Sequence, residues 1–107
     1  MGDIMELDEI FEISLLLDYY KNLLSDKQKE YLIEHFEEDC SLSEIAKRHN
    51  VTRQAVYDNI KRGVKILRDY EEKIGFYRRE REIYQELEKL RKNFTHENLD
   101  RIIENMF

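Results

Sequence analysis

The sequence predicts an all-α protein, and three observations favour this fold class. Proline is absent and glycine occurs three times, so the chain is poor in the residues that form the tight turns of a β-rich fold. Charged residues make up 39% and apolar residues 41% of the 107 positions, a balance typical of surface helices around a thin core. Apolar residues also recur at helical spacing between polar residues that cap helices. We expect a single domain over 1–107, which contains an N-terminal packing helix (1–24), a helix-turn-helix module (25–74) and C-terminal helices (75–107).

The cysteine content and the first residues indicate the compartment. Cys40 is the single cysteine, so an internal disulfide is impossible and a reducing environment is the simplest interpretation. No apolar run approaches the roughly 20 residues that span a bilayer. The first ten residues include four acidic residues (Asp3, Glu6, Asp8 and Glu9) and no basic one, whereas a signal peptide has a basic segment followed by an apolar one. We therefore expect a cytoplasmic protein without a membrane span.

Charge is distributed unevenly along the chain. Residues 1–42 carry 3 Lys or Arg against 12 Asp or Glu, a net charge of −9. Residues 43–81 carry 11 against 6, a net +5, and residues 82–107 carry 4 against 6, a net −2. The total is −6, but positive charge is concentrated in the middle third, as in a protein with a local nucleic-acid-binding surface.

The first predicted helix runs from about Glu6 to Leu23 and has more apolar surface than one contact requires. A surface helix of a monomer buries about a third of its circumference, and one face here suffices for that. The other face needs a second partner, either the C-terminal helices or another subunit. The inner face is Ile13, Leu17, Tyr20 and Leu24, and the outer face is Leu7, Phe11 and Leu15.

Polar caps divide the module into three helices. Each helix begins at a Ser or Thr whose hydroxyl can accept from a backbone N–H, and the first two have Gln or Glu three residues later, which completes a capping box. The caps are Ser25 with Gln28, Ser41 with Glu44, and Thr52. The third helix runs to about Lys73, before a stop at Gly75. The inner stripe of the first helix is Tyr31, Leu32 and Phe36. The inner stripe of the third helix is Val56, Ile60, Gly63 or Val64, Leu67 and Tyr70.

Two further helices are expected after the module. Apolar residues of the segment 76–94 lie near a heptad spacing that Glu80 interrupts, which favours a short antiparallel packing face over a long coiled coil. Thr95 caps the last helix. The apolar residues are Phe76, Ile83, Leu87, Leu90 and Phe94 in the first of these helices, and Leu99, Ile102, Ile103, Met106 and Phe107 in the second.

The spacing over residues 41–68 is that of a helix-turn-helix, in which a short helix and a tight turn precede a helix whose outer face is free to enter a groove. Ile45 and Val56 are expected to hold the two helices together, and Val51 to fill the turn. Asn50 tolerates the left-handed backbone that such a turn requires.

These residues resemble region 4 of the bacterial σ70-type factors, in which a helix precedes an SxxEIA…VSRxxV core. A closer resemblance extends over nearly the whole chain: LSDKQKEYL, DCSLSEIAKRHNVTRQAVYDNIKR and LRDYEEKIGFY together are similar to the YlxM family of small bacterial helix-turn-helix proteins. In that family the gene typically neighbours the genes for the signal recognition particle protein and its receptor. The resemblance therefore implies a regulatory or accessory role in the signal recognition particle pathway, with the protein or the RNA of that particle as a partner.

The candidate nucleic-acid-binding surface is the outer face of the helix that Thr52 caps, which is the second helix of the helix-turn-helix. With Val56 directed inward, a turn of about 100° per residue directs Gln54, Lys61 and Lys65 outward. Arg suits guanine and Gln suits adenine, so Arg53 and Gln54 would read bases in DNA while the lysines anchor the backbone. The candidate residues are Arg53, Gln54, Tyr57, Lys61, Arg62 and Lys65 on this helix, with Lys47 and Arg48 on the preceding helix as phosphate contacts.

RNA would be bound differently, because an α-helix does not fit the narrow major groove of an A-form duplex. Phosphate contacts and stacking would then dominate, with Tyr57, Arg62 and Lys65 as contributors. The alternative for the same face is a solvated surface. Asp58 favours it, since this carboxylate can pair with Lys61 and Arg62 at about 0.2–0.5 kcal/mol each and would repel phosphates.

Three functions remain open. The chain is a nucleic-acid-binding regulator in the signal recognition particle pathway, a purely protein-binding accessory factor of that particle, or a DNA-binding transcriptional regulator unrelated to it. No enzyme, cofactor or metal is predicted, because no catalytic constellation or phosphate-cradling glycine loop occurs, and His35, His49, His96 and Cys40 lack metal-ligand spacing.

The surplus apolar surface predicts a homodimer. The first helix and the helix over 76–94 are expected to take part in the interface, since large exposed apolar patches are unusual on soluble monomers. A dimer would also place two helix-turn-helix units on one assembly, as palindromic DNA sites require. The alternative is a monomer in which the first helix and the C-terminal helices close a larger core.

Overall fold

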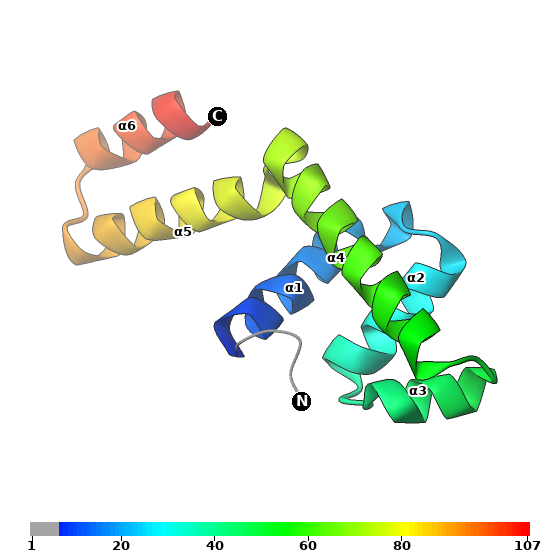
Figure 1. Cartoon of the computed structure of the whole chain (residues 1–107). Coiled ribbons are helices and arrows are strands. Elements are labelled where there is room, and N and C mark those ends of the chain that lie inside the picture. The colour runs from blue at the N-terminus through cyan, green and yellow to red at the C-terminus, as the bar shows by residue number, and fades with distance from the viewer. Residues whose placement is uncertain (1–6) are drawn as a thin grey trace. The chain divides into compact units, whose positions relative to one another are not determined.

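The computed structural model describes residues 7–107, and every regular element within them is a helix, which confirms the predicted fold class (Figure 1). Glu6, where the first helix was expected to begin, lies outside the described residues. The elements are α1 (Leu7–Tyr20), the short 3₁₀-helix η1 (Lys21–Leu23), α2 (Asp26–Leu32), the π-helix η2 (Ile33–Glu37), α3 (Leu42–His49), α4 (Arg53–Ile74), α5 (Phe76–Lys92) and α6 (His96–Met106).

The chain divides into two compact units, one that ends at Ile74 and one that extends from Gly75 to Phe107. Gly75 separates them with a left-handed backbone (φ 75°), which an L side chain adopts only with strain, so the predicted helix stop at this glycine is confirmed. The expectation of a single domain stays a prediction, and each unit is described by itself.

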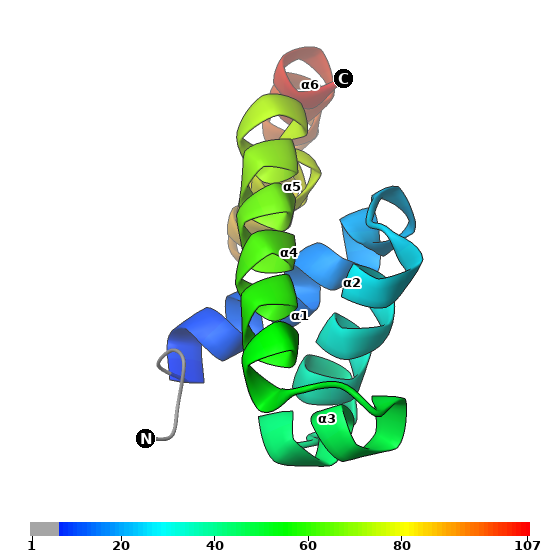
Figure 2. The ribbon, with the colours of Figure 1, turned by 45° about the vertical axis from the view of Figure 1, so that its right-hand side comes forward.

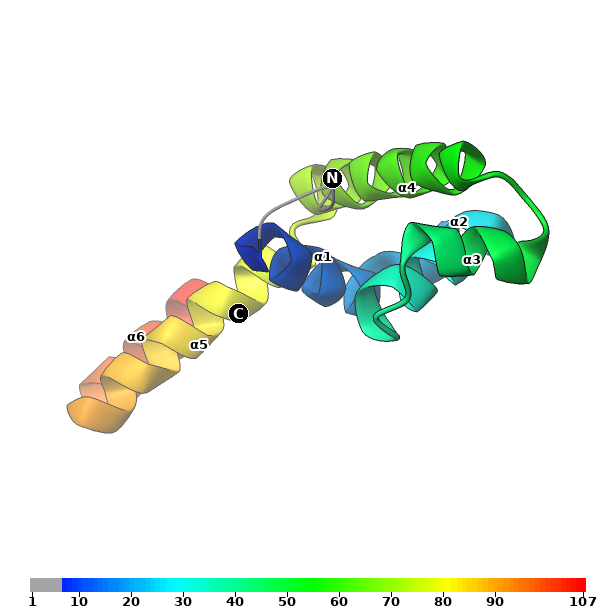
Figure 3. The ribbon, with the colours of Figure 1, turned by 60° about the horizontal axis from the view of Figure 1, so that its bottom comes forward.

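In the first unit α4 lies across a layer formed by α1, α2 and α3 (Figures 2 and 3). The predicted inner stripe of α4 is buried from Val56 to Leu67. Gly63 permits close approach to α2, because a Cβ at this position would lie 2.6 Å from Leu32 Cδ1. The buried apolar residues of this unit are Ile13, Leu16, Leu17, Tyr20, Leu24, Tyr31, Leu32, Leu42, Ile45, Ala46, Val56, Ile60, Val64 and Leu67.

Tyr70 differs from the rest of the predicted stripe because it is only half-buried. Its ring stacks on that of Tyr20, with centroids 6.0 Å apart. The Tyr20 hydroxyl in turn donates to the Glu71 carboxylate at 2.7 Å. These contacts attach the C-terminal half of α4 to the end of α1.

Every predicted helix cap is present. Ser25 with Gln28 and Ser41 with Glu44 form complete capping boxes. The Thr52 hydroxyl accepts from the Ala55 N–H at 3.0 Å, and the Thr95 hydroxyl accepts from the Asn98 N–H at 2.9 Å. The predicted starts of α2, α3, α4 and α6 are therefore confirmed.

The helix that begins at Ser25 ends in a wider turn than an α-helix. From Ile33 to Glu37 it continues as the π-helix η2, in which the Glu38 N–H bonds to the Ile33 carbonyl at 3.0 Å. The predicted end of this helix over 37–39 is confirmed, since Asp39 adopts a left-handed conformation (φ 59°). The wider turn places Glu34 in a buried position.

In the second unit α5 and α6 form an antiparallel hairpin (Figure 1). Leu90 and Ile102 are its buried apolar side chains. α5 ends at Lys92, two residues before the predicted end at Phe94, because Asn93 leaves the helical conformation (φ −141°). No helix among residues 7–107 is long and apolar enough to cross a membrane.

Two of the three apolar residues on the outer face of α1 are exposed. Leu7 and Phe11 keep 79% and 68% of their surface accessible, and Leu15 is half-buried. Leu16 is buried although it was not assigned to the inner face, because α1 is covered over a wider arc than one narrow stripe.

Candidate nucleic-acid interface

The turn between α3 and α4 has the geometry of a helix-turn-helix. Asn50 closes α3 in the left-handed conformation (φ 56°, ψ 47°), as predicted. The Val51 N–H then donates to the Ala46 carbonyl at 3.0 Å. Ile45 and Val56 are fully buried, and α3 packs on α4. The two helices are thus held at a fixed angle by their own core residues.

The prediction that Val51 fills this turn is wrong. Its side chain keeps 37% of its surface exposed. The backbone hydrogen bond from its N–H to Ala46 closes the turn instead, so no buried plug is needed.

The start of α3 is fixed by an ionisable cap. The Ser41 N–H donates to the Glu44 carboxylate at 2.8 Å, and the Glu44 N–H donates to the Ser41 hydroxyl at 3.0 Å. The hydrogen bond from the Ser41 N–H lowers the pKa of Glu44, so the carboxylate is charged at neutral pH. Negative charge in the first helical turn also interacts favourably with the helix dipole.

The predicted nucleic-acid residues of α4 lie on the side of the helix away from its buried stripe. Val56, Ile60 and Leu67 are buried. All the candidates on α4 are exposed except Tyr57, which is half-buried. Over residues 53–65 the helix carries four cations against the single carboxylate of Asp58. The face therefore presents positive charge to solvent beside the helix-turn-helix turn.

Neighbours on the same helix hold several of these side chains. The Gln54 amide donates to Asp58 at 3.0 Å, and Arg62 donates to Asn59 at 3.3 Å. Lys61 Nζ lies 5.5 Å from the centroid of the Tyr57 ring. The proposed pairing of Asp58 with Lys61 and Arg62 is wrong for the described residues, because the Asp58 carboxylate accepts from Gln54 instead.

Lys65 and Arg53 differ in how their charge is compensated. Lys65 Nζ lies 3.3 Å from the Asp69 carboxylate, at an exposed i,i+4 spacing that contributes little to stability. Within residues 7–107 the Arg53 and Lys47 side chains form no hydrogen bond or ion pair, and both are exposed. These two charges are open to a ligand without breaking any existing contact.

Arg48, the other candidate on α3, already has a partner. Its Nη1 donates to the Glu34 carboxylate at 2.7 Å, and Nη2 lies 3.8 Å from the Cys40 sulfur. Cys40 and Glu34 together raise the pKa of Arg48, so the guanidinium remains charged. A phosphate contact by Arg48 would have to share this guanidinium with Glu34.

Glu34 is a buried charged residue of the module that the sequence did not predict. Its buried carboxylate also lies 2.7 Å from His49 Nε2, and His49 packs edge-on against Tyr31 with ring centroids 5.0 Å apart. Glu34 thereby joins η2 to the last turn of α3. Its partners are 14 and 15 residues away, a separation that no helical repeat indicates.

A groove between α1 and α4 extends the basic face. Its volume is about 560 Å³, and it contains Arg68, which is not among the candidate residues. Arg68 lies 3.3 Å from Glu9 and 3.9 Å from Glu12 of α1. The groove is lined by Glu9, Ile60, Lys61, Arg62, Val64, Lys65, Arg68 and Asp69.

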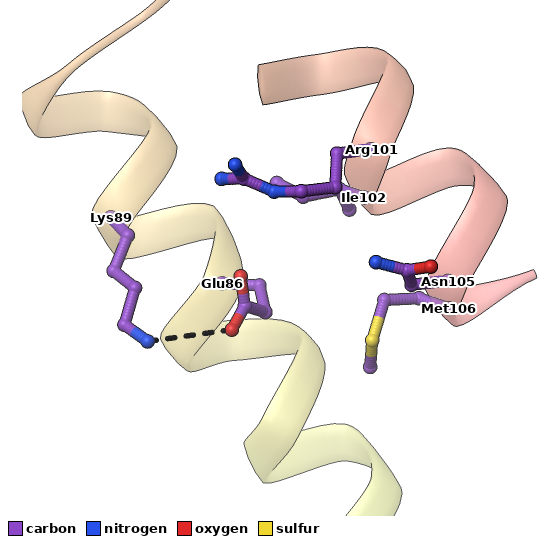
Figure 4. Close-up of a pocket in the computed structure, with 6 residues that line it drawn as sticks. All are labelled: Glu86, Lys89, Arg101, Ile102, Asn105 and Met106. Atoms are coloured by element: carbon purple, nitrogen blue, oxygen red, sulfur yellow. Dashed lines mark hydrogen bonds and ion pairs between the residues drawn. The ribbon is translucent and has the colours of Figure 1, made fainter. Parts of the chain in front are cut away.

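The second unit has a smaller hollow of about 360 Å³ between α5 and α6 (Figure 4). Arg101 and Ile102 of α6 point toward α5, and Lys89 pairs with Glu86 on α5 at 3.4 Å. The lining carries charges of both signs and indicates no particular ligand. No cluster of three or more potential metal ligands occurs among residues 7–107.

The fold and the α3–turn–α4 geometry define a helix-turn-helix protein. Comparison with known proteins gives the particular family: the helix-turn-helix family described as YlxM / p13 like matches residues 7–106. The chain belongs to this family. A UPF0122 protein of Fusobacterium nucleatum is 61% identical over 102 residues, which cover 95% of this chain and 99% of the relative. A UPF0122 protein of Halalkalibacterium halodurans is 40% identical over 104 residues (94% and 95%), and the UPF0122 protein YofM of Lactococcus lactis is 42% identical over 91 residues (85% and 82%).

Proposed function

We propose that this protein is a non-catalytic regulatory or accessory factor of the signal recognition particle pathway that binds nucleic acid through the exposed face of α4. One observation supports the binding surface above all. The second helix of the helix-turn-helix buries Val56, Ile60 and Leu67 and exposes a row of cations beside the turn. The family resemblance supports a role in this pathway, and with it we propose a cytoplasmic location.

The residues divide into two roles in this proposal. Arg53 and Gln54 stand on the first turn of α4, where recognition helices reach base edges. Lys61, Arg62 and Lys65 follow along the same face and bind phosphates. Lys47 and Arg48 of α3 add phosphate contacts, of which Lys47 is the more available because Arg48 is bonded to Glu34.

RNA and DNA use this face differently. In DNA the N-terminal turn of α4 enters the major groove, and Gln54 exchanges its hydrogen bond to Asp58 for one to a base. In RNA the same cations contact phosphates of unpaired segments, and Tyr57 offers a half-buried ring for stacking. The particle named by the resemblance contains RNA, so RNA is the first ligand to test.

A second candidate function is the binding of a basic partner protein, such as the protein of the particle. The observation in its favour is the charge of α1, whose 14 residues include Asp8, Glu9, Glu12 and Asp18 and no Lys or Arg. Such a surface attracts the basic surface of an RNA-binding protein. The protein is also proposed to act as a homodimer, which presents two α4 helices on one assembly.

Capture from lysate with and without nuclease separates these functions. The immobilised chain is incubated with lysate of a bacterium that encodes a relative, and retained RNA and protein are identified. We expect the RNA of the signal recognition particle to be retained and lost after nuclease treatment. Retention of the particle's protein alone, unchanged by nuclease, would favour the protein-binding function, whereas retention of neither would contradict the pathway assignment.

A further inference from the structure

The α5–α6 hairpin buries less apolar surface than an independent unit of its length needs. Leu90 and Ile102 are the buried apolar side chains of residues 75–107. A polar contact closes the open end of the hairpin, where the Arg79 guanidinium donates to the Met106 carbonyl. Units of this size require a further source of stability, because their own core contributes too little to offset the entropy of ordering.

Large apolar side chains remain exposed on both helices of the hairpin. Leu87 keeps 47% and Ile103 52% of its surface accessible, although both are adjacent to the buried contact between α5 and α6. We call the exposed set the hairpin face: Tyr84, Leu87, Phe94, Ile103 and Phe107. Together these side chains expose on the order of several hundred Å², as much as the largest apolar patch of a typical soluble monomer.

The exposed residues of the two helices lie on the same side of the hairpin. At about 100° per residue, Leu87 is displaced by about 60° from the buried Leu90 around α5. Ile103 is displaced by about 100° in the same rotational sense from the buried Ile102 around α6. Because the helices are antiparallel, rotations of the same sense lead to the same side of the pair (Figure 1). Leu87 and Ile103 therefore form the centre of the hairpin face on one side of the pair.

Charge indicates what covers this surface. α5 carries six Lys or Arg against four Glu, a surplus of two positive charges. α6 carries one Arg against two Glu and one Asp, a surplus of two negative charges. When two hairpins meet face to face around a two-fold axis, α5 of one copy can lie against α6 of the other, so the opposite surpluses attract.

We propose that the hairpin face is a self-association surface, on which a second copy of this chain binds to form a four-helix bundle from two α5–α6 hairpins. This inference rests on the homodimer in the proposed function and names its interface. In such a bundle the exposed apolar residues of both copies form the core that each hairpin lacks. The α1 face of Leu7 and Phe11 stays outside the contact, contrary to the expectation from sequence that α1 takes part.

Light scattering of three proteins at about 10 μM tests the interface. The wild-type chain is compared with Leu87→Gln/Ile103→Gln and with the control Leu7→Gln/Phe11→Gln, which removes the same number of exposed apolar side chains from α1. We expect twice the single-chain mass of 13.2 kDa for the wild type and the control, and 13.2 kDa for the hairpin variant. The expected effect is a rise of at least about tenfold in the dissociation constant.

The outcomes separate the dimer from its interface. A wild-type mass of 13.2 kDa overturns self-association and this proposal together. A dimer that persists in the hairpin variant, or one that also dissociates in the control, leaves self-association intact and overturns the interface. If circular dichroism shows that the hairpin variant has lost helix, Phe94→Gln/Phe107→Gln replaces it, because both positions lie outside the bounds of α5 and α6.

Discussion

At the scale of single residues, Glu34 joins the π-helix η2 to the last turns of α3. The carboxylate is buried and both of its oxygens are occupied, one by Arg48 and one by His49, at 2.7 Å each. A buried carboxylate is stable only with such partners. Removal of the Glu34 carboxylate leaves the His49 imidazole without this hydrogen-bond partner. Hydrophobic periodicity could not reveal this residue, since Glu34 stands in a π-helical turn that shifts its direction and its partners are distant in sequence.

We expect Glu34→Ala to lower the free energy of unfolding by about 1–3 kcal/mol, because it removes both hydrogen bonds from a buried position. Most of the lost free energy comes from the contact with His49, whose side chain is 16% exposed. The contact between Glu34 and Arg48 contributes less, because the Arg48 side chain is 53% exposed and solvent screens the ion pair. Urea denaturation followed by circular dichroism measures the loss.

Glu38→Ala is the matched control for this variant. The Glu38 carboxylate also approaches Arg48, at 3.9 Å, but both side chains are more than half exposed. We expect a change within about 0.5 kcal/mol. Equal losses in the two variants would show that the buried position of Glu34 has no special effect.

At the scale of elements, the helix starts could be predicted and the contacts between helices could not. Capping is local, so a Ser or Thr and the residue three positions later determine the start of α2, α3, α4 and α6. The hydrogen bond between Gln54 and Asp58 also joins nearby residues, but Gln54, Lys61 and Arg62 all lie within reach of that carboxylate, and charge favoured the two cations. The groove beside Arg68 depends on the packing of α1 against α4, which no local pattern specifies.

The cap of α3 predicts a dependence of stability on pH. Folding lowers the pKa of Glu44 through the hydrogen bond from the Ser41 N–H. The cap therefore contributes its stability above the ordinary Glu pKa of about 4.3, and this contribution is lost as the pH falls through the lower pKa of the folded state. Glu44→Gln keeps an acceptor at this position, as Gln28 does in the other capping box, but does not titrate.

Thermal unfolding between pH 7 and pH 3 measures this contribution. We expect the melting temperature of the wild type to fall more on acidification than that of Glu44→Gln, with the difference developing below about pH 4. Parallel pH curves for the two proteins would mean that the charge on Glu44 does not stabilise the cap.

At the scale of the whole molecule, the two units differ in how completely their apolar residues are covered. The first unit is complete in its core and presents the cationic face of α4, whereas the second unit leaves its apolar face uncovered. The all-α class, the helix-turn-helix and the family could be predicted from composition, caps and motif. The ligand could not, because a charged helix face is compatible with nucleic acid and with solvent until its binding is measured.

The central claim is that the exposed face of α4 binds nucleic acid, and the salt dependence of binding by Arg53→Ala/Lys61→Ala tests it most directly. Fluorescence anisotropy with labelled single-stranded RNA and duplex DNA, titrated at several salt concentrations, gives the dissociation constant and its slope. Lys27→Ala/Lys92→Ala is the control, since it removes two exposed cations outside α4. We expect the α4 variant to bind at least about tenfold more weakly, with a slope reduced by about two counterions, and the control to match the wild type. Unchanged affinity and slope in the α4 variant, or equal losses in both variants, would contradict the claim.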